Sequence, residues 1–120
     1  MIQGYFRDDA PRVTLTLIGD TGRREVEFVV DTGFTGMLAL PPFLLEAVGA
    51  TLQGSRQVQL ADGTQRRTPF YTVQIEWDGE PRTVRATALD DEPLLGISLL
   101  REHHLHIEIT DGGEVVAEPL

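Results

Sequence analysis

The chain has 120 residues, which is enough for one domain with a hydrophobic core but not for two. Ten arginines and no lysine stand against nineteen acidic residues, and the net charge of −9 argues against nucleic acid or an anionic membrane as the main partner. The chain contains no cysteine, which excludes disulfides, thiolate metal sites and cysteine nucleophiles. No apolar run approaches the ~20 residues of a membrane span.

Composition and the N-terminal residues indicate the class of protein. Hydrophobic residues make up 41% of the chain and charged residues 24%, as in ordinary globular domains, so we expect a single domain over residues 1–120. The first residues lack the basic and apolar stretches of a signal peptide. Together with the absence of cysteine, this favours a cytoplasmic protein.

The first half of the chain predicts a hairpin, a further strand and a short helix. Residues 13–18 alternate between apolar and polar side chains, the period-two pattern of a half-buried strand. Turn residues follow, and residues 25–30 resume as a second strand, so the two strands are predicted to pair. Residues 34–40 again resemble a strand. Residues 41–49 predict a short helix, with proline at its start and glycine at its end.

The second half predicts further short strands. Residues 58–60 and 71–77 alternate in the same way around a hairpin tip at residues 61–64, and residues 83–89 follow as another strand. Residues 97–103 could form one or two helical turns.

A last hairpin, residues 105–109 with residues 114–117, closes the chain. Short strands separated by turns, with one or two short helices, indicate a mainly β protein with a small closed or sandwiched sheet.

The tripeptide Asp-Thr-Gly occurs twice. Asp20 lies between two glycines and precedes two arginines, which is typical of an exposed hairpin turn. Asp31 instead follows an apolar run and precedes a strand-like segment, where a carboxylate costs free energy unless hydrogen bonds or a function compensate. Both a buried turn aspartate and a functional one fit this position. The strand between Asp20 and Asp31 separates them by roughly 26 Å, so the two cannot share a proton.

The chain resembles the retropepsin-like aspartic proteases, most closely the small prokaryotic members. The resemblance rests on Val29-Val30-Asp31-Thr32-Gly33, on Leu94-Leu95-Gly96 about sixty residues later, and on the order of the surrounding strands. It covers nearly the whole chain. It implies a small closed β-barrel of the retropepsin type, assembled as a homodimer.

The resemblance also implies the activity of an aspartic endopeptidase. Such enzymes hold a water between two carboxylates that share one proton, and need no metal or other cofactor. The chain has no second half with its own copy of the motif, so the second carboxylate is expected from Asp31 of another copy, brought beside the first by two-fold symmetry. The expected ligand is a peptide or protein substrate.

Within the loop that carries Asp31, the resemblance assigns Thr32 to a hydrogen-bonded lock between the two active-site loops and Gly33 to the backbone that meets substrate. Phe34 is expected to contact substrate, and it is larger than the alanine or serine often found there. Viral relatives commonly pair an acidic residue with an arginine at the positions of Thr35 and Ile97. Because both charged partners are absent here, the dimer must be secured in a different way.

Two further segments are expected to bind substrate. Ala61-Asp62-Gly63 corresponds to the tip of a flap that closes over the peptide, with Gly63 allowing a tight turn. Leu94 and Leu95 correspond to the wall behind the catalytic loop, with Leu94 facing the side chains of the substrate.

Two alternatives stay open. The first is a non-catalytic dimeric module with the same fold, which binds peptides or supports assembly and cleaves nothing. The second is a metal-binding β-domain that uses the cluster His103, His104 and His106. On a strand, His104, His106 and Glu108 would share one face and could ligate a divalent ion. The same pattern suits the polar face of an amphipathic strand, and no second ligand cluster has recognised zinc spacing.

Overall fold

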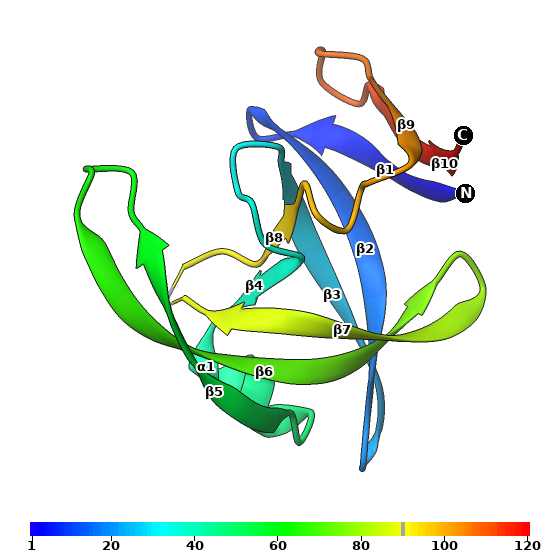
Figure 1. The fold of residues 1–120 in the computed structure, drawn as a ribbon. Coiled ribbons are helices and arrows are strands. Elements are labelled where there is room, and N and C mark those ends of the chain that lie inside the picture. Colours follow the sequence, from blue (N-terminus) through cyan, green and yellow to red (C-terminus); the bar gives the residue numbers. More distant parts are fainter. Residues whose placement is uncertain (90) are drawn as a thin grey trace.

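The computed structural model describes residues 1–89 and 91–120, and these residues form a mainly β domain with little helix (Figure 1). The described elements in chain order are β1 (Ile2–Arg7), β2 (Ala10–Gly19), β3 (Gly22–Asp31), β4 (Leu38–Leu40), α1 (Pro42–Ala47), β5 (Thr51–Gln59), β6 (Gln65–Trp77), β7 (Glu80–Ala88), β8 (Leu94–Gly96), β9 (His103–Ile107) and β10 (Glu114–Pro119).

Six of these strands close into a barrel. Neighbouring strands around the ring are β2, β3, β8, β4, β7 and β6, and the pairing of β6 with β2 completes it. That last pairing joins residues 16–18 of β2 to residues 74–76 of β6. β5 extends the sheet beyond β6, while β1, β10 and β9 extend it beyond β2, so the two chain ends lie side by side (Figure 1). The predicted small closed β-barrel is confirmed.

Apolar side chains at alternate strand positions fill the barrel. The alternation that predicted the first two strands is the burial pattern of β2 and β3, whose inward side chains are Val13, Leu15, Leu17, Val26, Phe28 and Val30. The intervening polar residues point away from this core, as the period-two geometry of a strand requires.

The predicted short helix is present as α1, although it is shorter than residues 41–49. Pro42 occupies the first helical position, where its missing N–H costs no helical hydrogen bond. Gly49 adopts a φ of +66° and ends the segment. Leu44 and Leu45 are buried against the barrel. No helix among residues 1–89 and 91–120 is long and apolar enough to cross a membrane.

The helical turns expected over residues 97–103 are absent. This segment makes successive tight turns instead, in which the N–H of Leu100 donates to the carbonyl of Ile97 at 3.1 Å and the N–H of His103 donates to that of Leu100 at 3.1 Å. Glu102 has a φ of +63°, which interrupts a helix. The N–H groups at the start of the segment donate to the loop after β3.

Several strands differ from their predicted extents. β4 covers only Leu38–Leu40 of the strand-like residues 34–40, and β6 begins at Gln65 rather than at residue 71. β1 was not anticipated, and it forms by pairing with β2 and β10. β5 has nine residues although only residues 58–60 were expected as a strand, because residues 51–57 show no apolar alternation. β9 ends at Ile107 rather than at residue 109. In each case, hydrogen bonds to a partner strand set the bounds, and a pattern of side chains does not report those partners.

Truncation of Phe28 tests the core. Phe28 is fully buried in β3, so Phe28→Ala is expected to lower the free energy of unfolding by about 3–5 kcal/mol. Phe43 on α1 is 64% exposed, and Phe43→Ala is expected to change it by less than about 0.5 kcal/mol. Chemical denaturation of both variants measures the difference. Equal losses would contradict the assignment of Phe28 to the core.

Candidate active site

Asp31 is brought beside the second sequence motif by a parallel strand pair. β3 ends at Asp31 and pairs with β8 in the register Val29 with Leu94, Val30 with Leu95 and Asp31 with Gly96. Residues more than sixty positions apart are therefore adjacent. β8 also pairs with β4, so it is held on both edges, and the end of β3 is fixed within the barrel wall.

The loop after Asp31 is tied to the turn after β8. The N–H of Ile97 donates to the carbonyl of Phe34 at 2.8 Å, and the N–H of Ser98 donates to the carbonyl of Gly36 at 3.2 Å. The hydroxyl of Ser98 donates to the carbonyl of Thr35. These bonds satisfy the backbone of a loop that has no strand partner, and they hold the loop in one conformation.

Glycine is required where these two segments cross. A Cβ atom on Gly96 would lie 2.1 Å from the carbonyl oxygen of Gly36 and 2.7 Å from the ring of Phe34. A Cβ atom on Gly36 would lie 2.6 Å from the same ring. The ring of Phe34 therefore packs over both glycines, and the backbones approach more closely than any residue with a side chain allows.

The carboxylate of Asp31 is oriented by the backbone of its own loop. The N–H of Gly33 donates to Oδ1 of Asp31 at 2.9 Å, and the N–H of Phe34 donates to its main-chain carbonyl at 3.1 Å. Asp31 is half-buried, while Thr32 and Gly33 are exposed. The carboxylate is thus positioned at the surface of the barrel wall, with one oxygen bonded and the other able to bind water.

A cleft of about 560 Å³ lies between this loop and the β5–β6 hairpin. Its lining comprises Asp31, Gly33, Phe34, Thr35, Gly36, Arg56, Gln57, Val58, Gln59, Leu60, Ala61, Thr87, Leu89 and Leu94. Asp31 is the only carboxylate among these residues, and Arg56 is the only cation. The volume lies within the usual range for ligand sites.

The predicted substrate-binding residues fall into three groups. Phe34, Ala61 and Leu94 line the cleft, and their roles stay predictions. Leu95 is fully buried in the hydrophobic core, so it supports the wall from behind and does not offer a surface to a ligand. Asp62 and Gly63 lie at the exposed tip of the hairpin, outside the cleft lining.

The hairpin tip has a well-bonded turn. Oδ1 of Asp62 accepts a hydrogen bond from the hydroxyl of Thr64 at 2.6 Å and another from its N–H at 2.9 Å. These bonds lower the pKa of Asp62 because they stabilise its ionised form, and the bond from the hydroxyl of Thr64 has the larger effect. Gly63 has a φ of +87°, which favours glycine as the sequence predicted.

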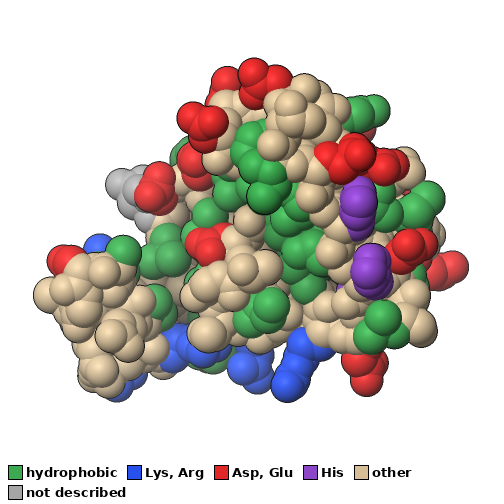
Figure 2. Space-filling model, turned by 90° about the horizontal axis from the view of Figure 1, so that it is seen from above, with side chains coloured by type: hydrophobic (Ala, Val, Ile, Leu, Met, Phe, Trp, Pro, Cys, Tyr) green, Lys and Arg blue, Asp and Glu red, His purple; other side chains and the backbone are tan. Residues whose placement is uncertain are grey.

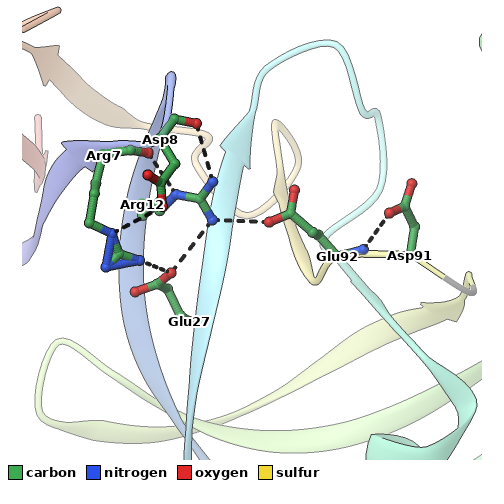
Figure 3. A network of polar contacts seen from close by, with 6 residues as sticks. All are labelled: Arg7, Asp8, Arg12, Glu27, Asp91 and Glu92. Carbon is green, nitrogen blue, oxygen red and sulfur yellow. Dashed lines mark hydrogen bonds and ion pairs between the residues drawn. The ribbon is translucent and has the colours of Figure 1, made fainter. Parts of the chain in front are cut away.

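An ion network fixes the segment that leads into β8 (Figure 3). The guanidinium of Arg12 on β2 bonds the carboxylate of Glu92 at 3.0 Å and lies 3.5 Å from that of Glu27 on β3. The bond to Glu92 is the largest cause of a raised pKa at Arg12. Pro93, the next residue, accepts a hydrogen bond at 2.9 Å from the N–H of Val29. The network was missed from the sequence because its members are up to 80 positions apart.

The other Asp-Thr-Gly motif is a hairpin turn, as predicted. Gly19 pairs with Gly22, and Asp20 with Thr21 forms the tip between β2 and β3. This turn is at the bottom of Figure 1, at the opposite end of β3 from Asp31. The length of β3 separates the two aspartates by roughly 30 Å.

The C-terminal histidines do not gather in the predicted combination. His106, Glu108 and Glu114 approach one another, with ligand atoms within 4.8 Å, and Glu114 from β10 takes the place expected for His104. Figure 2 shows histidine and acidic side chains together on this face. All three residues are exposed, and exposed acidic side chains commonly gather without an ion. This cluster alone does not define a metal centre.

Comparison with known proteins bears on the fold. No protein-family model matches the chain. No curated protein sequence matches it either. Among solved structures, the chain is similar to the crystal structure of a retropepsin-like aspartic protease from Rickettsia conorii, with 20% sequence identity, a TM-score of 0.55, and coverage of 97% of this chain and 93% of that chain. The closed barrel described above therefore has a retropepsin-like fold.

The close approach of the two glycines can be tested directly. Gly96→Ala places a methyl group against the backbone of Gly36, so we expect a loss of about 1–3 kcal/mol in the free energy of unfolding. Gly54→Ala is a matched control, because a Cβ atom there meets only the ring of Phe70 at 3.4 Å, an ordinary contact. Thermal unfolding of the two variants gives the comparison. A Gly96→Ala protein as stable as the control would show that the loops do not cross this closely.

Proposed function

We propose that this chain is an aspartic endopeptidase that hydrolyses peptide bonds as a homodimer, with Asp31 of each subunit as its catalytic pair. The observation that carries the proposal is the register between β3 and β8, which sets an oriented aspartate beside Gly96 at the edge of a cleft. The retropepsin-like fold supports the same reading, and so does the short Asp-Thr-Gly turn that exposes the carboxylate.

The catalytic pair requires a second chain. Among the described residues that line the cleft, Asp31 has no other carboxylate with which to share a proton. Its loop is exposed at Thr32 and Gly33, and Ile97 on the neighbouring turn is 41% exposed. A two-fold axis beside this loop would place the Asp31 carboxylates of the two subunits together, and it would cover the Ile97 side chain of each subunit. In this dimer, an apolar contact between the two Ile97 side chains would take the place of the charged pair that viral members of the family have.

In the proposed reaction, the two carboxylates share one proton and bind one water. The ionised carboxylate takes a proton from the water, and the oxygen of the water attacks the scissile carbonyl carbon. The protonated carboxyl group donates its proton to the carbonyl oxygen. The resulting diol collapses when a proton passes to the leaving amide nitrogen. The N–H of Gly33 orients Asp31 throughout. Thr32 is proposed to lock the two loops together.

The substrate is proposed to lie as an extended peptide between the barrel wall and the β5–β6 hairpin. Leu94 and Phe34 supply apolar surface to its side chains, and Ala61 contacts it from the hairpin. Closure of the hairpin would bring Asp62 and Gly63 over the peptide and exclude water from the reacting bond. The hydrogen-bonded tip turn keeps these two residues in one conformation as the hairpin moves.

The two Asp-Thr-Gly motifs provide a matched test of the catalytic assignment. Asp31→Asn keeps the size of the side chain but removes the general base, so peptide cleavage is expected to fall by at least about 10²–10⁴-fold. Asp20→Asn changes the same residue type in the hairpin turn, and its activity is expected to stay within about twofold. The measurement is the cleavage of a fluorogenic peptide library between pH 3 and pH 7 at equal dimer concentrations.

Retained cleavage in Asp31→Asn would overturn the assignment. Absence of cleavage by the wild-type dimer, with intact binding of peptides, would instead favour the non-catalytic peptide-binding module. A wild-type protein that stays monomeric at micromolar concentration would also contradict the proposal, since Asp31 is the only carboxylate that the described residues of one chain supply to the cleft.

The role of Ile97 in the dimer can be tested in the same way. Ile97→Glu would bring two like charges together beside the axis in an apolar contact, so we expect the dimer dissociation constant to rise by about 100-fold or more, with a parallel loss of activity at low concentration. Ile109→Glu is the control, because Ile109 is 78% exposed and lies in the turn between β9 and β10. Sedimentation velocity of both variants measures the effect. An unchanged dimer in Ile97→Glu would place the interface elsewhere.

A further inference from the structure

One face of the β5–β6 hairpin turns toward the cleft and carries an arginine. We call the arm the part of this hairpin that extends past β7: β5, the turn, and residues 65–69 of β6, which pair with β5 alone. Figure 1 shows the arm projecting from the barrel at the left, and Figure 2 shows it as a separate lobe on the same side. Arg56 lies in the middle of β5 and is among the residues that line the cleft.

The register of the hairpin indicates where the side chain of Arg56 points. Alternate residues of a strand share a face, so Arg56 is on the same face as Val58, which is half-buried. Thr68 of β6 is paired directly with Arg56 and is only 1% exposed. Directly paired residues in an antiparallel sheet lie on one face. The face that bears Arg56 is therefore the one that turns toward the body of the protein.

Arg56 differs from most arginines of the chain in its contacts. Arg12 and Arg23 form ion pairs, and Arg82 and Arg85 lie over aromatic rings. Arg56 makes no ion pair or hydrogen bond through its side chain within the described part of the chain. It is a cation at the wall of a cleft, with its donors available to a ligand.

The hydroxyl of Thr68 adds a polar group beside Arg56. Its Oγ1 is buried and has no hydrogen-bond partner among the described residues. This oxygen is closed to solvent and Thr68 does not line the cleft, so the hydroxyl marks a face packed against the protein and is not itself a contact for a ligand.

The arm also differs in charge from the rest of the protein. Residues 51–69 contain three arginines and one aspartate, whereas the rest of the chain contains seven arginines and eighteen acidic residues. Figure 2 shows acidic side chains distributed over the remainder of this face. Arg66, opposite Val58, adds a second positive charge to the face that carries Arg56. A basic wall in an acidic protein gives a local preference that the net charge of −9 does not predict.

We propose that Arg56 makes the cleft selective for peptides with an acidic side chain in the segment that runs along β5. The inference rests on the proposed peptide-binding cleft and names its substrate class. The guanidinium of Arg56 binds the carboxylate of a glutamate or aspartate of the peptide through charge-assisted hydrogen bonds. Asp31, the other charged residue of the described lining, does not bind this side chain and acts at the scissile bond in the proposed reaction.

The experiment measures binding separately from turnover. Fluorescein-labelled decapeptide libraries are made in pairs that differ only in Glu or Gln at one fixed position, and the fixed position is moved along the peptide. Anisotropy is measured with the Asp31→Asn dimer, which is expected to bind without cleaving, at 0.15 M salt, where charges farther than about 8 Å are screened. At one position at least, the Glu library is expected to bind about tenfold more tightly than the Gln library.

Variants of the arm identify the residue responsible. In the Asp31→Asn background, Arg56→Gln is expected to reduce the preference to less than about twofold, and Arg56→Glu to reverse it. The matched control is Arg67→Gln, which removes the same charge from the other face of the arm, where Arg67 donates to the hydroxyl oxygen of Ser55 at 3.2 Å. This control is expected to keep the preference. Arg56 is exposed, so thermal unfolding of its variants should match that of the parent.

Each outcome supports or overturns the inference. Loss of the Glu preference in Arg56→Gln, with its retention in Arg67→Gln, supports a specific site at Arg56. Equal binding of the two libraries by the parent, or equal loss of the preference in both arginine variants, overturns it. The proposed peptidase function fails separately, when the wild-type dimer binds these libraries but cleaves none of them.

Discussion

The parallel pairing of β3 with β8 is the contact on which the candidate site depends. It is only three residues long, yet it aligns Asp31 with Gly96 and joins the two halves of the barrel wall. Parallel pairing of so short a segment is weak by itself. It is maintained because β8 is also paired with β4, because Leu95 is buried in the core, and because Arg12 holds the preceding Glu92. The contacts that stabilise this part of the barrel are therefore the same contacts that position Asp31.

The same contact explains the composition of the loop after β3. The carbonyl of Gly36 passes so close to Gly96 that residue 96 cannot carry a side chain, and the ring of Phe34 leaves no room for a Cβ atom on Gly36. Phe34 thus has a structural reason to be large, in addition to any contact with a ligand. The two glycines beneath it accommodate the size of the ring.

The charge of the protein is unevenly arranged around the cleft. The barrel is acidic, while the arm is basic and places Arg56 opposite the loop of Asp31. Among the described residues that line the cleft, Asp31 is the only carboxylate, and its loop is largely uncovered, so the cleft is half of a symmetric site under the proposed function. A dimer would present two arms and two Arg56 side chains to one peptide, and the peptide could then meet an arginine on either side of the scissile bond.

The alternation of apolar residues in β2 and β3, the helix after Pro41, and the positions of Asp20 in a hairpin turn and of Asp31 at the end of a strand were all readable from the sequence, because each depends on neighbouring residues. The path of residues 97–103, the length of β5, the burial of Leu95 and the pairing of Arg12 with Glu92 were not readable, because they depend on partners distant in the chain. Local side-chain pattern indicated where β2, β3, β6 and β7 lie, but not β1 or most of β5. Tertiary hydrogen bonding and close packing decided which strands meet, and thereby which side chains face the cleft.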